Sequence, residues 1–205
     1  MWNKIKEERK LETTDEYIRE WFKDHVVKRY EKHDSVEHLF FSKPNSSNYS
    51  ILFIRSFGTL FVAGDLGDAV FQWPGDSSLE WISNCNLDYF KGKCQASEVG
   101  RDFSEWDEEY AIKSVLEYVT EYCDEEDEVK GKIEKLDESE WRSNIHSEFE
   151  WAGWLNENGS EVLEDQDYWE WAFSVGKVIH TRCRAHLIGL QEAIKKLPES
   201  EKPEQ

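Results

Sequence analysis

Residues 49–73 read YSILFIRSFGTLFVAGDLGDAVFQW, and this stretch decides the fold. It contains three runs rich in β-branched and aromatic residues, at 49–57, 59–63 and 69–73. Gly58 and residues 64–68 separate these runs as tight turns would, which predicts neighbouring antiparallel strands. Because both faces of the first run are largely apolar, we expect the sheet to be central, with helices covering at least one of its faces.

Outward from this stretch, the pattern predicts an α+β fold. A further β-type run at 36–42 extends the sheet, so we expect a small antiparallel β-meander of three to four strands over residues 36–73. Thr13 and Glu16 form a capping-box pattern before the first helical run. Apolar residues at helical spacing predict helices at about 14–32, 78–85, 104–122, 137–156 and 169–197. Residues 86–103 have no clear period, and we expect them to be irregular.

Chain length favours a single domain over residues 1–198, with a polar tail at 199–205 that is too hydrophilic to fold. Ten Trp, eight Tyr and eleven Phe supply the apolar area for one core. The first residues are charged where a signal peptide is apolar, and no stretch is long enough for a membrane span. Four cysteines without a framework spacing indicate reduced thiols, so we expect a cytoplasmic protein.

The net charge of −19 is concentrated in the middle third of the chain. Residues 1–100 carry 13 basic and 16 acidic side chains, residues 101–170 carry 6 and 24, and residues 171–205 carry 6 and 4. Such an acidic segment repels nucleic acid and anionic membranes, and it attracts basic protein surfaces. We therefore expect a protein partner and no direct binding of nucleic acid or membrane.

The acidic helical segment at 104–156 has two interpretations. Spread along two adjacent helices, its charge approaches the density of duplex DNA, which predicts binding to the nucleic-acid channel of another protein. The alternative is a solvated face kept for solubility. The candidate partner-binding residues are Asp124, Glu125, Glu126, Asp127, Glu128, Glu134, Asp137 and Glu138.

Tryptophans gather in the same segment. They are Trp106, Trp141, Trp151, Trp154, Trp169 and Trp171. Most are expected in the core, while one or two exposed rings would be enough to anchor a protein partner.

Chemical motifs are sparse. His180, Cys183 and His186 are spaced three apart and are zinc-binding residue types, but Cys183 and His186 lie on the apolar stripe of the last helix, so we interpret them as buried core residues. Asp65 and Asp68 occupy a Gly-rich turn, where Asp is an ordinary turn former as well as a candidate Mg²⁺ ligand.

No phosphate loop, nucleophile elbow or HExxH motif is present, and the sequence predicts neither a catalytic residue nor a cofactor. A metal-dependent hydrolase using the residues above stays an alternative. So does a nucleotide-binding protein, if basic side chains line a pocket against the sheet. The candidates for such a lining are Arg55, Lys91, Lys93 and Arg101.

Residues 58–73, GTLFVAGDLGDAVFQW, resemble a family of uncharacterised bacteriophage and prophage proteins. Residues 89–97 and 184–190 share this resemblance, whereas the acidic middle does not. The resemblance implies an accessory phage protein that disables a host defence, of the anti-CRISPR or anti-restriction type. It supplies no catalytic residue. Together with the charge, it predicts a non-enzymatic inhibitor that binds a basic, nucleic-acid-binding surface of a host complex.

Overall fold

The computed structural model describes residues 14–121, 126–163 and 167–198. Where the sequence suggests a single domain, the chain divides into two compact units. The sheet unit comprises Met1–Phe103 and Ile179–Gln205, and the helical unit is the insertion Ser104–Val178 between them. Each unit has its own cluster of buried apolar side chains. The polar tail predicted at 199–205 lies outside the described residues.

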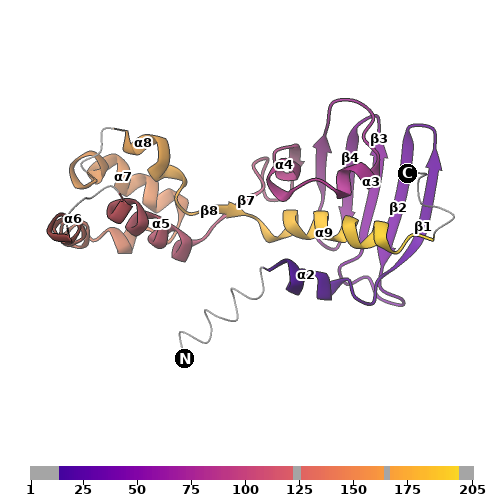
Figure 1. The fold of residues 1–205 in the computed structure, drawn as a ribbon, viewed down its shortest axis with the longest axis horizontal. Coiled ribbons are helices and arrows are strands. Elements are labelled where there is room, and N and C mark those ends of the chain that lie inside the picture. Colours follow the sequence, from indigo (N-terminus) through magenta and orange to yellow (C-terminus); the bar gives the residue numbers. More distant parts are fainter. Residues whose placement is uncertain (1–13, 122–125, 164–166, 199–205) are drawn as a thin grey trace. The chain divides into compact units, whose positions relative to one another are not determined.

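The sheet unit is built on a six-stranded antiparallel meander in which each strand pairs with the next along the chain (Figure 1). Its strands are β1 (Val26–His33), β2 (Val36–Ser42), β3 (Ile51–Ser56), β4 (Thr59–Gly64), β5 (Ala69–Gln72) and β6 (Cys94–Ser97). The four predicted runs are confirmed as β2 to β5. The α+β class is also confirmed, but the sheet has six strands instead of three or four.

Strand β1 corrects the predicted helix at 14–32. The helix α2 spans only Asp15–Trp21, and the hydroxyl of Thr14 caps it by accepting from the amide of Tyr17 at 3.2 Å. Val26 and Tyr30 have helical spacing, but they also fit a strand, and the β-branched pair Val26–Val27 favours one. Pairing along the whole of β2, with Tyr30 opposite Leu39, decides in favour of the strand.

Four helices of the sheet unit lie over one face of the sheet (Figure 1). They are α2, α3 (Leu79–Ser83), α4 (Leu87–Lys91) and α9 (Thr181–Lys195). Helix α9 packs closely because Gly189 has no side chain: a Cβ there would lie 2.6 Å from Cδ1 of Ile51. This helix begins at Thr181 and not at 169, since Nδ1 of His180 accepts from the amide of Arg182 and caps it.

The helical unit contains the whole of the predicted acidic helical segment at 104–156. Its elements are β7 (Ser104–Trp106), α5 (Glu108–Glu121), α6 (Glu126–Glu138), the 3-10 turn η1 (Trp141–Asn144), α7 (Glu148–Val162), α8 (Tyr168–Trp171), the 3-10 turn η2 (Ala172–Ser174) and β8 (Lys177–Ile179), which pairs with β7. The helix predicted at 137–156 is wrong in its bounds. The chain breaks at Glu140, whose φ is 54°, and Ser147 caps the separate helix α7.

Tryptophans form the centre of the helical unit's core. Trp141 and Trp151 are fully buried, and the rings of Trp151 and Trp154 stack at 4.9 Å. Their indole N–H groups are satisfied: Trp151 donates to the carbonyl of Ala172 at 2.7 Å and Trp154 to that of Ser139 at 3.1 Å. These rings are therefore structural, as expected for most of the set. Among the described residues, no helix is long and apolar enough to cross a membrane.

Candidate protein-binding surface

Almost all of the net negative charge of the chain belongs to the helical unit. The helical unit carries 23 acidic and 6 basic side chains, a balance of −17. The sheet unit carries 21 acidic and 19 basic side chains, a balance of −2. The acidity is therefore a property of one compact unit, and the other unit is close to neutral.

Four of the six basic side chains of the helical unit pair with carboxylates of the same unit. Lys113 pairs with Glu117 at 3.3 Å, and Lys177 pairs with Glu148 at 2.7 Å. Lys130 and Arg142 pair likewise with carboxylates of α6. Several exposed carboxylates of the unit form no salt bridge with a described cation, among them Glu121, Glu138, Glu157, Glu161 and Glu170. The surplus of negative charge thus faces solvent and is open to a basic partner.

The residues predicted to bind a partner fall on or before α6. Asp124 and Glu125 lie outside the described residues, and Glu126, Asp127 and Glu128 open α6 without described side chains. Glu134, Asp137 and Glu138 are exposed. Asp137 also has an internal role, because its Oδ1 accepts from Nε1 of Trp141 at 3.0 Å.

The structure adds a second acidic group that sequence reasoning missed. Oε2 of Glu108, at the start of α5, lies 3.0 Å from Nδ1 of His146, and Nε1 of Trp106 donates to the carbonyl of Ile145 at 2.8 Å. These contacts hold the first turn of α5 beside the chain that enters α7. We define the α5–α7 patch as Glu108, Glu109, Tyr110, His146, Glu148, Phe149 and Glu150.

Two exposed aromatic rings lie in the α5–α7 patch. Phe149 is 88% exposed and lies between Glu148 and Glu150 in the sequence, and Tyr110 is 48% exposed and follows Glu109. The Glu108 carboxylate accepts a hydrogen bond from His146 and raises the pKa of that imidazole. The motif Ser147-x-x-Glu150 is a capping box, and in the sequence it could have indicated that α7 begins here.

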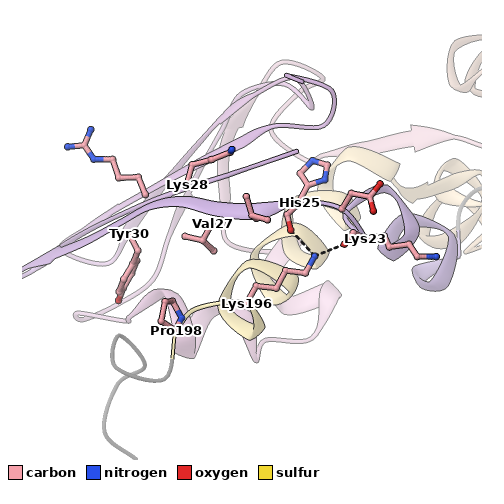
Figure 2. A pocket seen from close by; sticks show the side chains of 10 residues that line it. Lys23, His25, Val27, Lys28, Tyr30, Lys196 and Pro198 are labelled. Carbon is pink, nitrogen blue, oxygen red and sulfur yellow. Dashed lines mark hydrogen bonds between the residues drawn. The ribbon is translucent and has the colours of Figure 1, made fainter. Parts of the chain in front are cut away.

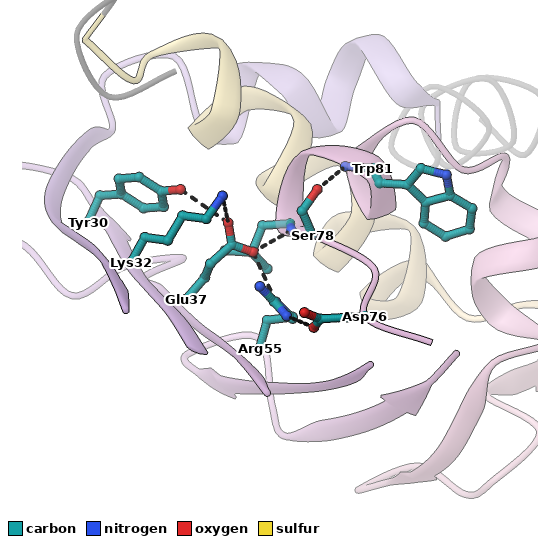
Figure 3. A network of polar contacts seen from close by, with 8 residues as sticks. Tyr30, Lys32, Glu37, Arg55, Asp76, Ser78 and Trp81 are labelled. Atoms are coloured by element: carbon teal, nitrogen blue, oxygen red, sulfur yellow. Dashed lines mark hydrogen bonds and ion pairs between the residues drawn. The ribbon is translucent and has the colours of Figure 1, made fainter. Parts of the chain in front are cut away.

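A buried polar network on the sheet is the other concentration of charged side chains (Figure 3). Glu37, 1% exposed, accepts from Nε of Arg55 at 3.0 Å, from the amide of Leu79 at 2.8 Å and from the hydroxyl of Tyr30 at 3.2 Å. Arg55 also pairs with Asp76. These donors occupy both oxygens of the carboxylate, and the network connects the start of α3 to the sheet.

The zinc-type residues of α9 are core residues, as interpreted from the sequence. Cys183 and His186 are fully buried, and no group of three metal-ligating side chains is found within the described ranges. Burial raises the pKa of the Cys183 thiol to about 12 and lowers the pKa of His186 to about 4. Neither ring nitrogen of His186 has a partner of good hydrogen-bonding geometry, and the nearby carbonyls of Leu66 and Gly67 offset the fall in pKa only in part.

The Gly-rich turn lies close to α9, so the two sequence motifs meet. A Cβ on Gly67 would lie 3.0 Å from the guanidinium of Arg182. The negative charge of Asp68 raises the pKa of the buried His186 ring and so opposes part of the effect of burial. Asp65 has a structural role, because its Oδ2 accepts from the amide of Tyr49 at 2.7 Å and so connects the Gly-rich turn to the loop before β3. The turn interpretation of this motif is the one that the geometry favours.

Two surface grooves among the described residues of the sheet unit are lined by basic side chains. One, of about 670 Å³, runs along β1, and there Nζ of Lys196 donates to the carbonyls of Phe22, Lys23 and His25 at 2.8–2.9 Å (Figure 2). Two of its other charged side chains are paired as well, since Lys23 contacts Glu20 and Arg29 contacts Glu31. This groove offers little free positive charge.

The second groove, of about 560 Å³, includes two of the four basic residues considered for a nucleotide pocket. Lys91 and Arg101 line it, together with the acidic residues Asp88 and Asp102. Of the other two candidates, Arg55 is buried in the network, and Lys93 lies over the ring of Tyr89 at 4.6 Å. The two cations of this groove are therefore balanced by two carboxylates.

In comparisons with known proteins, no family model, curated protein or solved structure matches this chain.

Proposed function

We propose that the helical unit is a non-enzymatic binding module that engages a basic, nucleic-acid-binding surface of another protein. The observation that carries the proposal is the division of charge, with −17 on the helical unit and −2 on the sheet unit. Charge that served solubility alone would gain nothing from this segregation, because either unit can display it. A charge concentrated on one unit gives that unit a field that steers it towards a basic surface.

The density of charge is sufficient for mimicry of nucleic acid. The longest helices of the helical unit, α5 and α7, have 14 and 15 residues. At about 1.5 Å per residue they are about 21–23 Å long, and a DNA duplex of that length carries about 13 charges at one per 1.7 Å. The unit's −17 exceeds that number. A phosphate-binding groove rich in Lys and Arg is thus a chemically matched partner.

The α5–α7 patch supplies what charge alone lacks, which is a contact surface. Phe149 exposes most of its ring next to Glu148 and Glu150, where it contributes nothing to the core of its own unit. Exposed aromatic anchors bordered by charge are typical of binding hot spots. We infer that Phe149 enters an apolar pocket of the partner while the surrounding carboxylates pair with its Lys and Arg.

The phage resemblance expected from residues 58–73 makes host defence complexes the first partners to test. The experiment is a competition in which the full chain displaces a labelled duplex from a purified restriction endonuclease or CRISPR effector complex. We expect displacement by the wild type, and a weaker effect when Glu108, Glu109, Glu148 and Glu150 are all replaced by Gln. A matched set on the rest of the unit, Glu138, Glu157, Glu161 and Glu170 to Gln, removes equal charge and should cost less affinity.

Two outcomes would count against this function. An equal loss of affinity in both sets of substitutions would show that the α5–α7 patch is not the contact surface and that only the overall charge of the unit matters. The binding function itself would be rejected if the chain displaced duplex from none of the complexes and if the immobilised chain also retained no protein from host extract at low salt.

A nucleotide-binding function is the second candidate, because Lys91 and Arg101 line the groove of about 560 Å³. Asp88 and Asp102 in the same groove oppose an anionic ligand, so we rank it lower. Equilibrium dialysis of the full chain against labelled ATP and cyclic nucleotides tests it. Binding that Arg101→Ala abolishes would support it, and no binding would reject it.

A further inference from the structure

The sheet has a second apolar face, opposite the one that the helices cover. Alternate residues of β3 point to opposite faces, and Phe53 is in the core, whereas Leu52 and Ile54 are on the other side and half-buried. The strand register continues this side across the sheet, because Ile54 lies opposite His38 on β2 and Phe61 on β4. Phe61 in turn lies opposite Val70 on β5 and is 44% exposed.

A strained and exposed residue lies in the turn at one end of β3 and β4. Phe57 and Gly58 form the two-residue turn between β3 and β4, with φ values of 47° and 75°. Turns with two positive φ angles favour Asn-Gly or Gly-Gly, and a bulky residue at the first position is strained by about 1 kcal/mol. Phe57 is also 76% exposed, so the core gains nothing from it. Val36, 39% exposed, lies on the neighbouring strand opposite Ser56.

We define the outer sheet face as the residues of β2 to β5 on this side together with the turn residue. They are Val36, His38, Phe40, Leu52, Ile54, Ser56, Phe57, Thr59, Phe61, Ala63, Val70 and Gln72. None of them is Asp, Glu, Lys or Arg. The register brings Arg29 and Glu31 of β1, an exposed ion pair, to the edge of the same side, opposite Phe40 and His38. In a chain with a net charge of −19, an uncharged centre with a charged rim is what a packed interface requires and what a solvated sheet face avoids.

We propose that the outer sheet face packs against the same face of a second copy of this chain. The sheet unit is nearly neutral at −2, so two copies can approach there without strong repulsion between the units themselves. Two antiparallel sheets pack face to face at about 10 Å, and one patch that meets itself closes a twofold dimer. Phe57 and Phe61 are its most exposed aromatic rings.

The size of the face sets the expected strength. Four strands about 4.8 Å apart, each with about six residues at about 3.4 Å, cover about 400 Å² of sheet plane per copy. Two copies together bury about 800 Å², and the rings of Phe57 and Phe61 add to this. Specific interfaces need about 1,000 Å² or more, so the dimer is weak and dependent on concentration.

The salt dependence separates this dimer from partner binding by the helical unit. Each copy carries −19, so screening by salt removes repulsion between copies and tightens the dimer. Binding of an acidic unit to a basic partner weakens under the same change. The two proposals therefore stand or fall independently.

Sedimentation equilibrium of the full chain, from low to several hundred micromolar and at two salt concentrations, tests the proposal. We expect a monomer–dimer equilibrium that shifts towards dimer at high salt. Phe61→Asp places a charge at the centre of the face and should raise the dissociation constant at least about tenfold. Trp169→Asp makes a similar change at a ring that is 59% exposed on the helical unit, and it should leave the dimer unchanged.

Phe57→Asn keeps the test decisive even if Phe61→Asp unfolds the chain. Asn-Gly suits this turn, so the variant should melt at a higher temperature than the wild type while its dimer dissociates more easily. If Phe57 affected folding alone, the variant would melt at a higher temperature but its dimer would be as stable as that of the wild type. A monomeric wild type at every concentration and salt would overturn the proposal, as would a dimer that Phe57→Asn and a folded Phe61→Asp both leave intact.

Discussion

The Nε atom of Arg55 donates to Oε2 of Glu37 at 3.0 Å, and both side chains are almost completely buried on the core face of the sheet. The same carboxylate accepts from the amide of Leu79, so one ion pair connects β2, β3 and the start of α3. A buried charge pair of this kind is maintained only while every member is satisfied.

Replacing Glu37 with Gln should therefore destabilise the sheet unit strongly. The guanidinium of Arg55 would stay buried without its charged partner at Glu37, and breaking such a pair costs about 3 kcal/mol of unfolding free energy. Urea denaturation followed by circular dichroism measures it. Glu31→Gln is the control, because Glu31 forms an exposed pair with Arg29 and its loss should change little. Equal effects of the two substitutions would refute the structural role of the network.

His186 should make the sheet unit less stable in mild acid. Burial lowers its pKa to about 4, whereas the unfolded chain binds a proton near pH 6.5. The stability from the neutral buried ring is thus complete above about pH 6.5 and is lost as the pH falls towards about 4, by up to about 3 kcal/mol.

The slope of stability with pH isolates the contribution of His186. His186→Leu should flatten the curve between about pH 4 and 6.5, as measured by urea denaturation at several pH values. His146→Gln is the matched control: Glu108 raises the pKa of His146, so its contribution is lost as the pH rises and does not add to a loss of stability towards acid. An unchanged slope in His186→Leu would mean that the ring is protonated or solvated in the fold.

Gly176 and Gly153 should respond in opposite ways to replacement by Ala. A Cβ at Gly176 would lie 2.6–2.7 Å from three atoms of the Trp106 ring, which its bond to Ile145 holds in place. Gly176→Ala should cost about 1–3 kcal/mol of stability. Gly153 lies within α7 with no atom within 4 Å of the added carbon, so Gly153→Ala should gain about 0.5–1 kcal/mol. Thermal melts of the two variants would contradict this packing if their shifts had the same sign.

Much of the sheet unit can be predicted from the sequence because its signals are local. Alternation and turn glycines locate β2 to β5, and the stripe that contains Cys183 and His186 correctly identifies the buried side of α9. Strand β1 is missed because Val26 and Tyr30 fit both periods, and only the pairing with β2 decides between them. The start of α9 is misplaced because 172–180 holds a 3-10 turn and a strand that no apolar period reveals.

The division into two units is not visible in the sequence, because the sheet unit is discontinuous. Phe103 ends its first segment and Ile179 begins its second, and His180 donates its amide to the carbonyl of Phe103 across the insertion. Only contacts between distant segments reveal such an arrangement. The α5–α7 patch was missed for the same reason, since Glu108 and His146 meet only in the fold. Composition did identify the acidic segment itself.

The central claim is that the helical unit binds its partner through segregated charge. The most direct test is the salt dependence of the dissociation constant between the full chain and the host complex whose duplex it displaces. We predict that affinity falls steeply with salt for the wild type, and that the set Glu108, Glu109, Glu148 and Glu150 to Gln lowers both the affinity and the steepness. Neutralising Glu16, Glu20, Glu31 and Glu80 of the sheet unit should change neither by a comparable amount. Equal affinity and equal salt dependence in all three proteins would contradict the account.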